Sequence, residues 1–201
     1  QGEVVGLVGE SGCGKSTLGR LGCGLHTPSE GDVLYRGVSV TAGGGRQPPI
    51  QMIFQDPFAS LNPRMRIAEI VGEAPRVHGL VGKGEVADYV ADLLRRVGLD
   101  ASYARRYPHQ FSGGQRQRIG IARALAVKPE FLICDEAVAA LDVSIQAQVL
   151  NLFMDLRESL GLTYLFISHD LGVVRHLSNR VVVMYLGRVV EIAATERLFE
   201  S

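Results

Sequence analysis

Tryptophan is absent from this sequence of 201 residues, cysteine occurs only three times, and neither sign of charge is in excess. Because 21 basic residues balance 21 acidic ones, no overall field attracts nucleic acid or an anionic membrane, and we expect no nucleic-acid partner. The odd number of cysteines, none of them in a C-x-x-C pair, disfavours a disulfide framework and a thiolate zinc site and fits a reducing cytosol. No apolar run approaches the roughly 20 residues that a bilayer-spanning helix needs.

Four short, almost continuous apolar runs are typical of strands that a parallel sheet buries on both faces. They are residues 3–8, 131–134, 163–168 and 180–185. The last run continues through 186–188 into a second apolar stretch, which predicts a hairpin, and residues 41–49 predict a loop.

Apolar residues at helical spacing fill the middle of the chain, at 67–99 and again at 114–126. A third helical stretch, 144–160, places six apolar side chains on one face: Ile145, Val149, Leu152, Phe153, Leu156 and Leu160. Sheet segments therefore bracket a helical insert.

The stretch GESGCGKS, residues 9–16, follows the first apolar run and precedes a helical segment. It matches the phosphate-loop pattern G-x-x-x-x-G-K-[ST] in the strand–turn–helix context that the pattern requires. Its glycines let consecutive N–H groups turn inward, which predicts an anion cradle, although a glycine-rich turn that merely precedes a helix is the alternative. Lys15 would reach the terminal phosphates and Ser16 would bind Mg²⁺. The residues expected to bind nucleotide are Gly9, Ser11, Gly12, Cys13, Gly14, Lys15, Ser16 and Thr17.

Three glycines in the following helical segment need a separate explanation, because each costs about 1 kcal/mol relative to alanine in a helix interior. We expect Gly19 and Gly22 to pack closely against the sheet. Gly24 is expected to cap the end of the helix.

Two apolar runs end in polar residues, and the carboxyl ends of parallel strands are where ligands bind. Asp135 is predicted to bind Mg²⁺ and Glu136 to act as the general base that activates water. Without the phosphate loop, an acidic pair after a strand would also fit an ordinary turn. His169 is predicted to contact the γ-phosphate, with a polar residue at a strand end as the alternative. Ser168, His169 and Asp170 cannot form a hydrolase triad, because neighbours along an extended chain point to opposite faces.

The stretch FSGGQRQRIGIARAL, residues 111–125, predicts a second anion site. Ser112, Gly113 and Gly114 precede a helix with an apolar face, so the helix would begin with open backbone N–H groups.

These motifs together make the chain resemble the nucleotide-binding domain of ABC transporters. FSGGQ is similar to the family's signature motif, with Phe111 where Leu is usual, and Gln55 in IFQDP corresponds to its Q-loop glutamine. AALD, residues 139–142, corresponds to its D-loop, and His169 to its switch histidine. The resemblance implies ATP and Mg²⁺ as cofactors and ATP hydrolysis as the activity. It adds Gln55, Ser112, Gly113, Gly114, Gln115 and Asp142 to the nucleotide-binding residues, makes Ser16, Gln55 and Asp135 the Mg²⁺ ligands, and makes Glu136, His169 and Lys15 the catalytic residues.

The resemblance also implies an architecture. We expect an α/β fold of the P-loop NTPase (RecA-like) type, with a mostly parallel sheet flanked by helices, a helical signature-motif subdomain and a small antiparallel β region. Residues 1–56 and 127–201 would form the ATP-binding core of one domain, and 57–126 the helical subdomain. Since the family's upstream strands and its adenine-stacking aromatic residue have no counterpart here, we expect the chain to be a fragment.

IFQDPFASLNPRM and ALDVSIQAQVLNL are similar to the subgroup that imports dipeptides, oligopeptides or nickel. This resemblance implies a peripheral position on the cytoplasmic face of the inner membrane and a head-to-tail dimer with a second ATP-binding subunit. It also implies permease subunits that contact the region after Gln55, and indirectly a substrate-binding protein. The sequence leaves open the cargo and the choice between homodimer and heterodimer.

Two other classes stay open. One is a soluble ABC ATPase of DNA repair or translation, although the helical insert is short and lacks a basic run. The other is a regulatory module without turnover, against which the intact catalytic residues argue. Two departures from the family pattern bear on subunit coupling: Ala137 stands where Pro is usual, and Ala139 where Ser is common.

Overall fold

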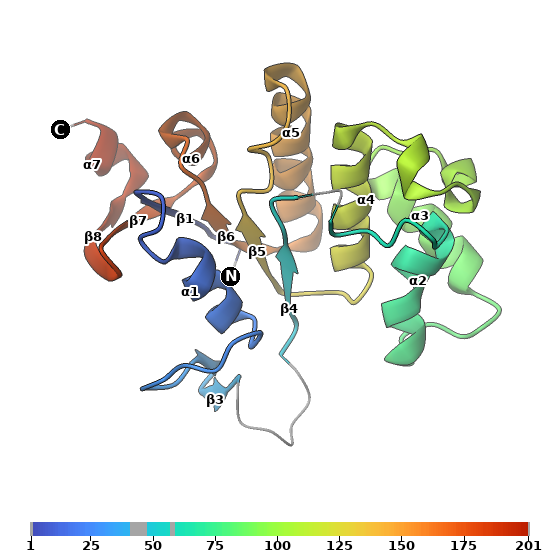
Figure 1. The fold of residues 1–201 in the computed structure, drawn as a ribbon, viewed down its shortest axis with the longest axis horizontal. Coiled ribbons are helices and arrows are strands. Elements are labelled where there is room, and N and C mark those ends of the chain that lie inside the picture. Colours follow the sequence, from blue (N-terminus) through green and yellow to red (C-terminus); the bar gives the residue numbers. More distant parts are fainter. Residues whose placement is uncertain (1, 41–47, 57–58, 201) are drawn as a thin grey trace. The chain divides into compact units, whose positions relative to one another are not determined.

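The computed structural model describes residues 2–40, 48–56 and 59–200 (Figure 1), so most of the loop predicted at 41–49 lies outside the described residues. Within this part of the chain, six strands form one sheet in the order β4-β5-β6-β1-β7-β8. They are β1 (Val4–Gly9), β4 (Ile50–Ile53), β5 (Phe131–Asp135), β6 (Thr163–Ile167), β7 (Arg180–Tyr185) and β8 (Arg188–Ala194). A separate small antiparallel pair consists of β2 (Leu34–Tyr35) and β3 (Val38–Ser39).

The centre of the sheet is parallel, as the continuous apolar runs predict. β1 pairs in parallel with both β6 and β7, and β5 pairs in parallel with β6. β8 returns antiparallel to β7 through a two-residue turn at Leu186 and Gly187, whose φ values are 46° and 79°. Positive φ at both turn positions suits the twist of a tight hairpin, and the predicted hairpin is confirmed.

Contacts within the chain divide it into two compact units. The sheet unit comprises residues 1–52, 130–136 and 154–201, and the helical unit comprises 53–129 and 137–153. Residues 137–153, which were expected in the ATP-binding core, fall in the helical unit of this division.

The described residues of the sheet unit contain three complete helices: α1 (Lys15–Gly22), α6 (Leu171–Leu177) and α7 (Thr195–Phe199). α1 and α6 cover opposite faces of the sheet, because the residues that meet them alternate along paired strands. A Cβ at Gly6 of β1 would lie 2.5 Å from Val174 of α6. A Cβ at Gly19 of α1 would instead lie 3.0 Å from Ile167 of β6, whose register partner is Leu7.

The helix glycines behave as predicted. Cδ1 of Ile133 in β5 lies 3.0 Å from the position of a Cβ at Gly22, so α1 packs so closely against the sheet that a side chain there would push this neighbour aside. Gly24 has a φ of 73°, and the N–H groups of Gly24 and Leu25 donate to the carbonyls of Leu21 and Arg20. This is the Schellman arrangement, in which a left-handed glycine ends the helix.

The helical unit contains α2 (Ile67–Val77), α3 (Val86–Arg96), α4 (Gly113–Leu125) and two 3₁₀ turns, Ala101–Arg105 and Pro108–Gln110. The predicted helical stretch 67–99 is interrupted, because Gly79 adopts a φ of 65° and ends α2. The core of the helical unit contains fully buried side chains from α2, α3 and α4: Ile67, Val71, Val90, Leu94, Ile119 and Ile121.

α5 (Val143–Leu160) runs through both units. Its predicted apolar face is confirmed for Val149, Leu152, Phe153 and Leu156, which are buried. The prediction is wrong for Leu160, which is 41% exposed, because it is the last residue of the helix.

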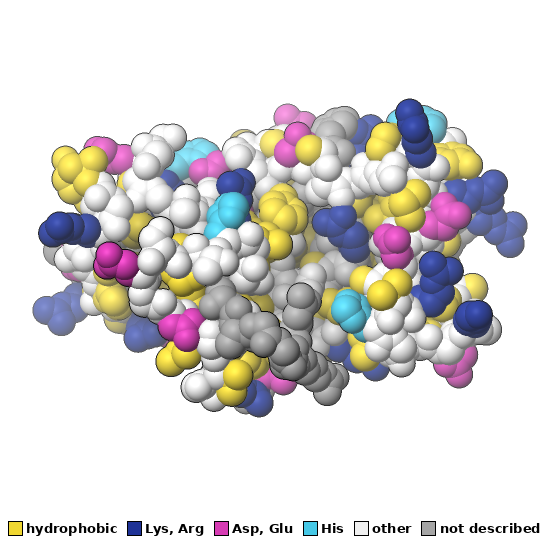
Figure 2. All heavy atoms as spheres, turned by 60° about the horizontal axis from the view of Figure 1, so that its bottom comes forward, with side chains coloured by type: hydrophobic (Ala, Val, Ile, Leu, Met, Phe, Trp, Pro, Cys, Tyr) yellow, Lys and Arg dark blue, Asp and Glu magenta, His cyan; other side chains and the backbone are white. Residues whose placement is uncertain are grey.

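Among the described helices, none combines the length and the apolar composition that crossing a bilayer demands. Basic and acidic side chains are both spread over the face drawn in Figure 2, so the charge balance of the sequence is also visible on this surface.

Candidate nucleotide-binding site

The predicted phosphate loop joins β1 to α1 in the sheet unit. Gly12 and Gly14 have φ values of 81° and 103°, a conformation that residues with a Cβ rarely adopt. Gly14 is the N-cap of α1, and no side chain caps the helix. The first backbone N–H groups of α1 therefore face the loop without a side chain across them, which is the geometry of an anion-binding helix N-terminus. Ser11, Gly12 and Thr17 are exposed around it.

Lys15 is buried in this loop, with 6% of its surface exposed. Its Nζ donates to the carbonyl oxygens of Gly9 at 2.8 Å and Glu10 at 2.9 Å, and lies 3.9 Å from Cys13 Sγ. An ammonium group has three donors, and a thiol is a weak acceptor. The lysine therefore keeps the capacity to bind a phosphate oxygen while two carbonyls hold it in place.

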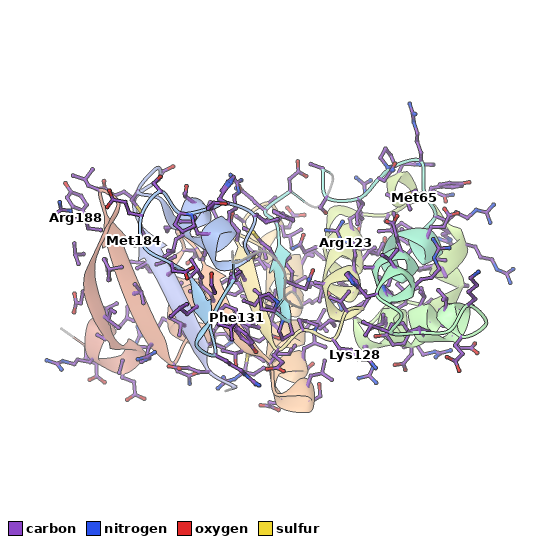
Figure 3. The ribbon with its side chains drawn as sticks, turned by 90° about the horizontal axis from the view of Figure 1, so that it is seen from below. Met65, Arg123, Lys128, Phe131, Met184 and Arg188 are labelled. Atoms are coloured by element: carbon purple, nitrogen blue, oxygen red, sulfur yellow. The ribbon has the colours of Figure 1, made fainter. Side chains whose placement is uncertain are left out.

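The β7–β8 hairpin supports the loop from the side. A Cβ at Gly9 would overlap the carbonyl oxygen of Met184, and Gly187 N donates to Cys13 O at 3.1 Å. Figure 3 shows Met184 at the β7–β8 end of the sheet. Neither contact could be predicted from the sequence, because no local pattern links segments so far apart in the chain.

Ser16 and Asp135 form a pair of oxygen donors beside the loop. Ser16 Oγ donates to Asp135 Oδ1 at 2.8 Å, and Asp135 ends β5 with only 6% of its surface exposed. Burial raises the pKa of Asp135 above its ordinary value, and the hydrogen bond from Ser16 opposes that shift. The predicted phosphate-loop serine and strand-end carboxylate are thus brought together.

Glu136 and His169 meet at the ends of two adjacent strands. Asp135 of β5 is in register with Ile167 of β6, and Glu136 N donates to Ile167 O at 3.0 Å. His169 Nδ1 lies 3.4 Å from Glu136 Oε1. Glu136 has a φ of 49°, and a left-handed conformation at a non-glycine residue is strained, as is common at functional positions.

The other two polar residues after β6, Ser168 and Asp170, form hydrogen bonds at the N-terminus of α6. The Asp170 carboxylate accepts from the N–H groups of Gly172 and Val173 at the start of α6. Ser168 Oγ in turn accepts from Asp170 N at 3.0 Å. Asp170 is therefore an N-cap, and the rejection of a Ser–His–Asp triad is consistent with these contacts.

The predicted second anion site lies at the start of α4 in the helical unit. Ser112 is the N-cap, and its Oγ accepts from Gln115 N at 3.3 Å. Gln115 Oε1 accepts from Ser112 N at 3.0 Å, which completes a reciprocal capping box. Gly113 and Gly114 contribute the next N–H groups of the helix, whose positive end favours an anion.

Two further predicted residues belong to the helical unit. Gln55 is exposed and lies two residues beyond Ile53, the last residue of β4. Asp142 is also exposed, and its carbonyl accepts from Gln146 N at 2.8 Å in the first turn of α5. Ala137 is buried, whereas Ala139 is exposed just ahead of Asp142.

A glycine-rich loop between a parallel strand and a helix, with a lysine inside it and a serine–carboxylate pair beside it, defines the P-loop class of nucleotide-binding proteins. The sequence model of the family described as ABC transporter matches residues 1–139. This chain belongs to the ABC transporter family.

Similar proteins of known sequence support the same family assignment. The chain is 54% identical over 208 residues to the oligopeptide transport ATP-binding protein OppF of Bacillus subtilis, covering 100% of this chain and 68% of OppF. It is 54% identical over 207 residues to AppF of the same organism, covering 100% of this chain and 63% of AppF. It is 52% identical over 204 residues to a putative peptide import ATP-binding protein of Brucella ovis, covering 99% of this chain and 64% of that protein. The chain thus spans about two thirds of the length of these relatives.

Solved structures confirm the predicted fold. The chain is similar to cbiO1 of Clostridium perfringens, part of the ABC transporter complex cbiONQ, with a TM-score of 0.86, 28% identity and coverage of 100% of this chain and 80% of cbiO1. It is also similar to the dimeric ATP-binding cassette MJ0796 in a post-hydrolysis state bound to ADP and Pi. The TM-score is 0.83, the identity is 30%, and the match covers 96% of this chain and 86% of MJ0796.

Proposed function

We propose that this chain binds and hydrolyses ATP as the energy-supplying subunit of an ABC importer for peptides. The observation that carries the proposal is the arrangement in the sheet unit, where Lys15, the Ser16–Asp135 pair and the Glu136–His169 pair all adjoin one phosphate loop or the ends of its neighbouring strands. The similar proteins OppF and AppF and the Brucella ovis protein are peptide transport or import ATP-binding proteins, which supports the cargo class.

ATP binding is assigned to the phosphate loop. Backbone N–H groups of residues 9–17 and the positive end of α1 would hold the phosphates. Lys15, held by the carbonyls of Gly9 and Glu10, would donate its third N–H to a phosphate oxygen. The loop glycines are needed because their backbone conformation brings the N–H groups close to the ligand.

The residues present also fit Mg²⁺. This cation takes hard oxygen ligands and is usually held by one or two carboxylates together with substrate phosphates. Ser16 Oγ and Asp135 Oδ1, 2.8 Å apart, provide such donors, and the described residues contain no group of three or more His, Cys, Asp or Glu that would form a full protein cage. Ser16 and Asp135 are the proposed ligands of the sheet unit, and Gln55 of the helical unit stays a prediction from the family resemblance. Bound Mg²⁺ would neutralise charge on the phosphates.

Hydrolysis is assigned to Glu136. Its carboxylate would accept the proton of a water molecule whose oxygen forms a bond to the γ-phosphorus, while the bond between that phosphorus and the bridging oxygen of ADP breaks. His169, 3.4 Å from the carboxylate, would keep Glu136 oriented and contact the γ-phosphate. The strained backbone at Glu136 fits a residue that the surrounding structure holds in position.

Ser112, Gly113, Gly114, Gln115 and Asp142 are proposed to act on the nucleotide of a second ATP-binding subunit in a head-to-tail dimer. Permease subunits would contact the region after Gln55, on the cytoplasmic face of the membrane, and a substrate-binding protein would deliver the peptide. The dimeric state of the similar cassette MJ0796 supports the first of these partners.

The test is phosphate release from Mg-ATP by the full-length protein, measured alone and after reconstitution with permease subunits and a peptide-binding protein in vesicles. We expect release that peptide stimulates and that accompanies peptide uptake. Release without any response to peptide or permease would favour a non-transport ATPase, and nucleotide binding without release would favour a regulatory module.

A further inference from the structure

The second glycine of the FSGGQ motif is packed against α5. Gly114 is buried, and a Cβ built on it would overlap Cγ2 of Ile145. Its backbone φ is not in the left-handed region, so glycine is not required there by conformation. The absence of a side chain is required by the close approach of Ile145.

Ile145 has little freedom to move aside. Cγ2 is a branch on Cβ, and a β-branched side chain in a helix has one strongly preferred χ1 rotamer. Other glycines of α4 lack such a neighbour: a Cβ at Gly113 would lie 3.8 Å from Leu141, which is ordinary contact, and a Cβ at Gly120 would meet no described atom within 4 Å. The tight contact is therefore specific to Gly114.

A second contact connects the same two helices one turn further along. Arg118, four residues after Gly114, donates from Nη2 to Gln148 Oε1 at 3.4 Å and from Nη1 to Val97 O at 2.8 Å. The first two turns of α4 and α5 are thus in contact at two points within the helical unit. α4 begins directly after Ser112 and α5 directly after Asp142.

We propose that Ile145 is a positioning residue for the second nucleotide site: its Cγ2 methyl, seated on the bare backbone of Gly114, sets the start of α4 relative to the 139–142 segment. The two segments would then meet the partner subunit's nucleotide as one rigid surface. This inference rests on the proposed function, and it assigns Gly114 a packing role that is independent of any contact with phosphate.

The test is a set of four full-length proteins, the parent, Gly114→Ala, Gly114→Ala with Ile145→Ala, and Gly114→Ala with Ile145→Val, each measured for phosphate release. A displacement of about 1 Å at a reacting site costs on the order of 10²-fold in rate, so we expect kcat of Gly114→Ala to fall by about that factor. Ile145→Ala should restore kcat, because Ile145 Cβ lies 3.7 Å from the new Cβ. Ile145→Val keeps the branch methyl and should not restore it.

Two further measurements separate packing from folding and from ATP binding. Monomeric ATP affinity, measured by calorimetry, should stay within about twofold in all four proteins, because the phosphate loop belongs to the sheet unit and is unchanged in each of them. Thermal unfolding should show the same rescue as kcat. Gly120→Ala, in the same helix but without a close neighbour, should leave kcat unchanged.

Several results would overturn the inference. If neither Ile145 substitution restores kcat, Gly114 is required by the nucleotide rather than by Ile145. If valine rescues as well as alanine, or if Gly114→Ala is fully active, the methyl contact has no positioning role. A parent that releases no phosphate overturns the proposed function and this role with it, and the unfolding data then show independently whether the two residues are coupled.

Discussion

The two units assemble their proposed nucleotide-binding residues in different ways. In the sheet unit, Ser16 donates to Asp135 across a sequence separation of 119, and Glu136 meets His169 only because β5 and β6 are adjacent. In the helical unit, Ser112 and Gln115 cap each other three residues apart. The first site forms only when the strands of the sheet are paired. The start of α4, by contrast, is capped by its own residues wherever the helix forms. Substitutions in the sheet unit should therefore alter chemistry and stability together.

Glu136→Gln should produce the largest effect and should separate binding from chemistry within the sheet unit. The amide cannot accept the water proton, and general-base catalysis contributes on the order of 10²–10⁴-fold, so kcat should fall by about that factor. ATP affinity should persist, because the phosphate loop is unchanged. Phosphate release and calorimetric titration measure the two quantities, and near-normal turnover would refute the assignment of the base.

Lys15→Ala should weaken the binding that Glu136→Gln preserves. Hydrogen bonds to charged groups contribute about 1.5–3 kcal/mol, so ATP affinity should drop about ten- to a hundredfold. The matched control is Lys83→Ala, an exposed lysine of the helical unit, which should bind as the parent does. Equal affinities of the two variants would show that Lys15 does not contact the nucleotide.

Replacing glycine by alanine should lower the free energy of unfolding in α1 and raise it in α4. Alanine at Gly19 gains about 1 kcal/mol of helix propensity, but its Cβ would lie 3.0 Å from Ile167 and 3.2 Å from Ile133. Both isoleucines are fully buried, and overpacking costs about 1–3 kcal/mol. We expect a net loss of about 1 kcal/mol for Gly19→Ala and a gain of similar size for Gly120→Ala.

Thermal unfolding of these two variants is the measurement. In a chain of this length 1 kcal/mol corresponds to roughly 2–4 °C in Tm. A rise in Tm for Gly19→Ala would mean that α1 has room to retreat from the sheet, and the close packing would then not explain the glycine.

Asp135→Asn should remove a pH dependence of the stability that the parent protein has, and this dependence arises in the sheet unit. Burial raises the pKa of Asp135, so the folded carboxyl holds its proton more tightly than the unfolded one, and the stability that it contributes is lost as pH rises through the folded-state pKa. The asparagine variant lacks this loss. It should hydrolyse no ATP and yet exceed the parent in Tm near pH 7, with the difference shrinking toward about pH 4. A parent that is the more stable at neutral pH would contradict the shift.

Much of the fold follows from local patterns. Continuous apolar runs predicted β1, β5, β6 and β7, and the turn residues predicted the hairpin to β8. The break at Gly79 had a local signal that the periodicity outweighed, since glycines at 79, 82 and 84 interrupt the helical stretch. No local signal predicts the exposure of Leu160, because helical periodicity does not reveal where along a helix the packing against other elements stops.

The sequence by itself determined which chemical groups are present and where each begins or ends an element: the phosphate loop before α1, the carboxylates after β5, the capping serine before α4, and the family. Those features depend on backbone conformation and on spacing over a few residues. Only the tertiary structure decided their partners. Ser16 is paired with Asp135 of another strand, Cys13 is contacted by the turn of a distant hairpin, and Gly114 is packed against Cγ2 of Ile145. Each of these depends on how closely two backbones approach, and that distance is set by the packing of all the side chains between them.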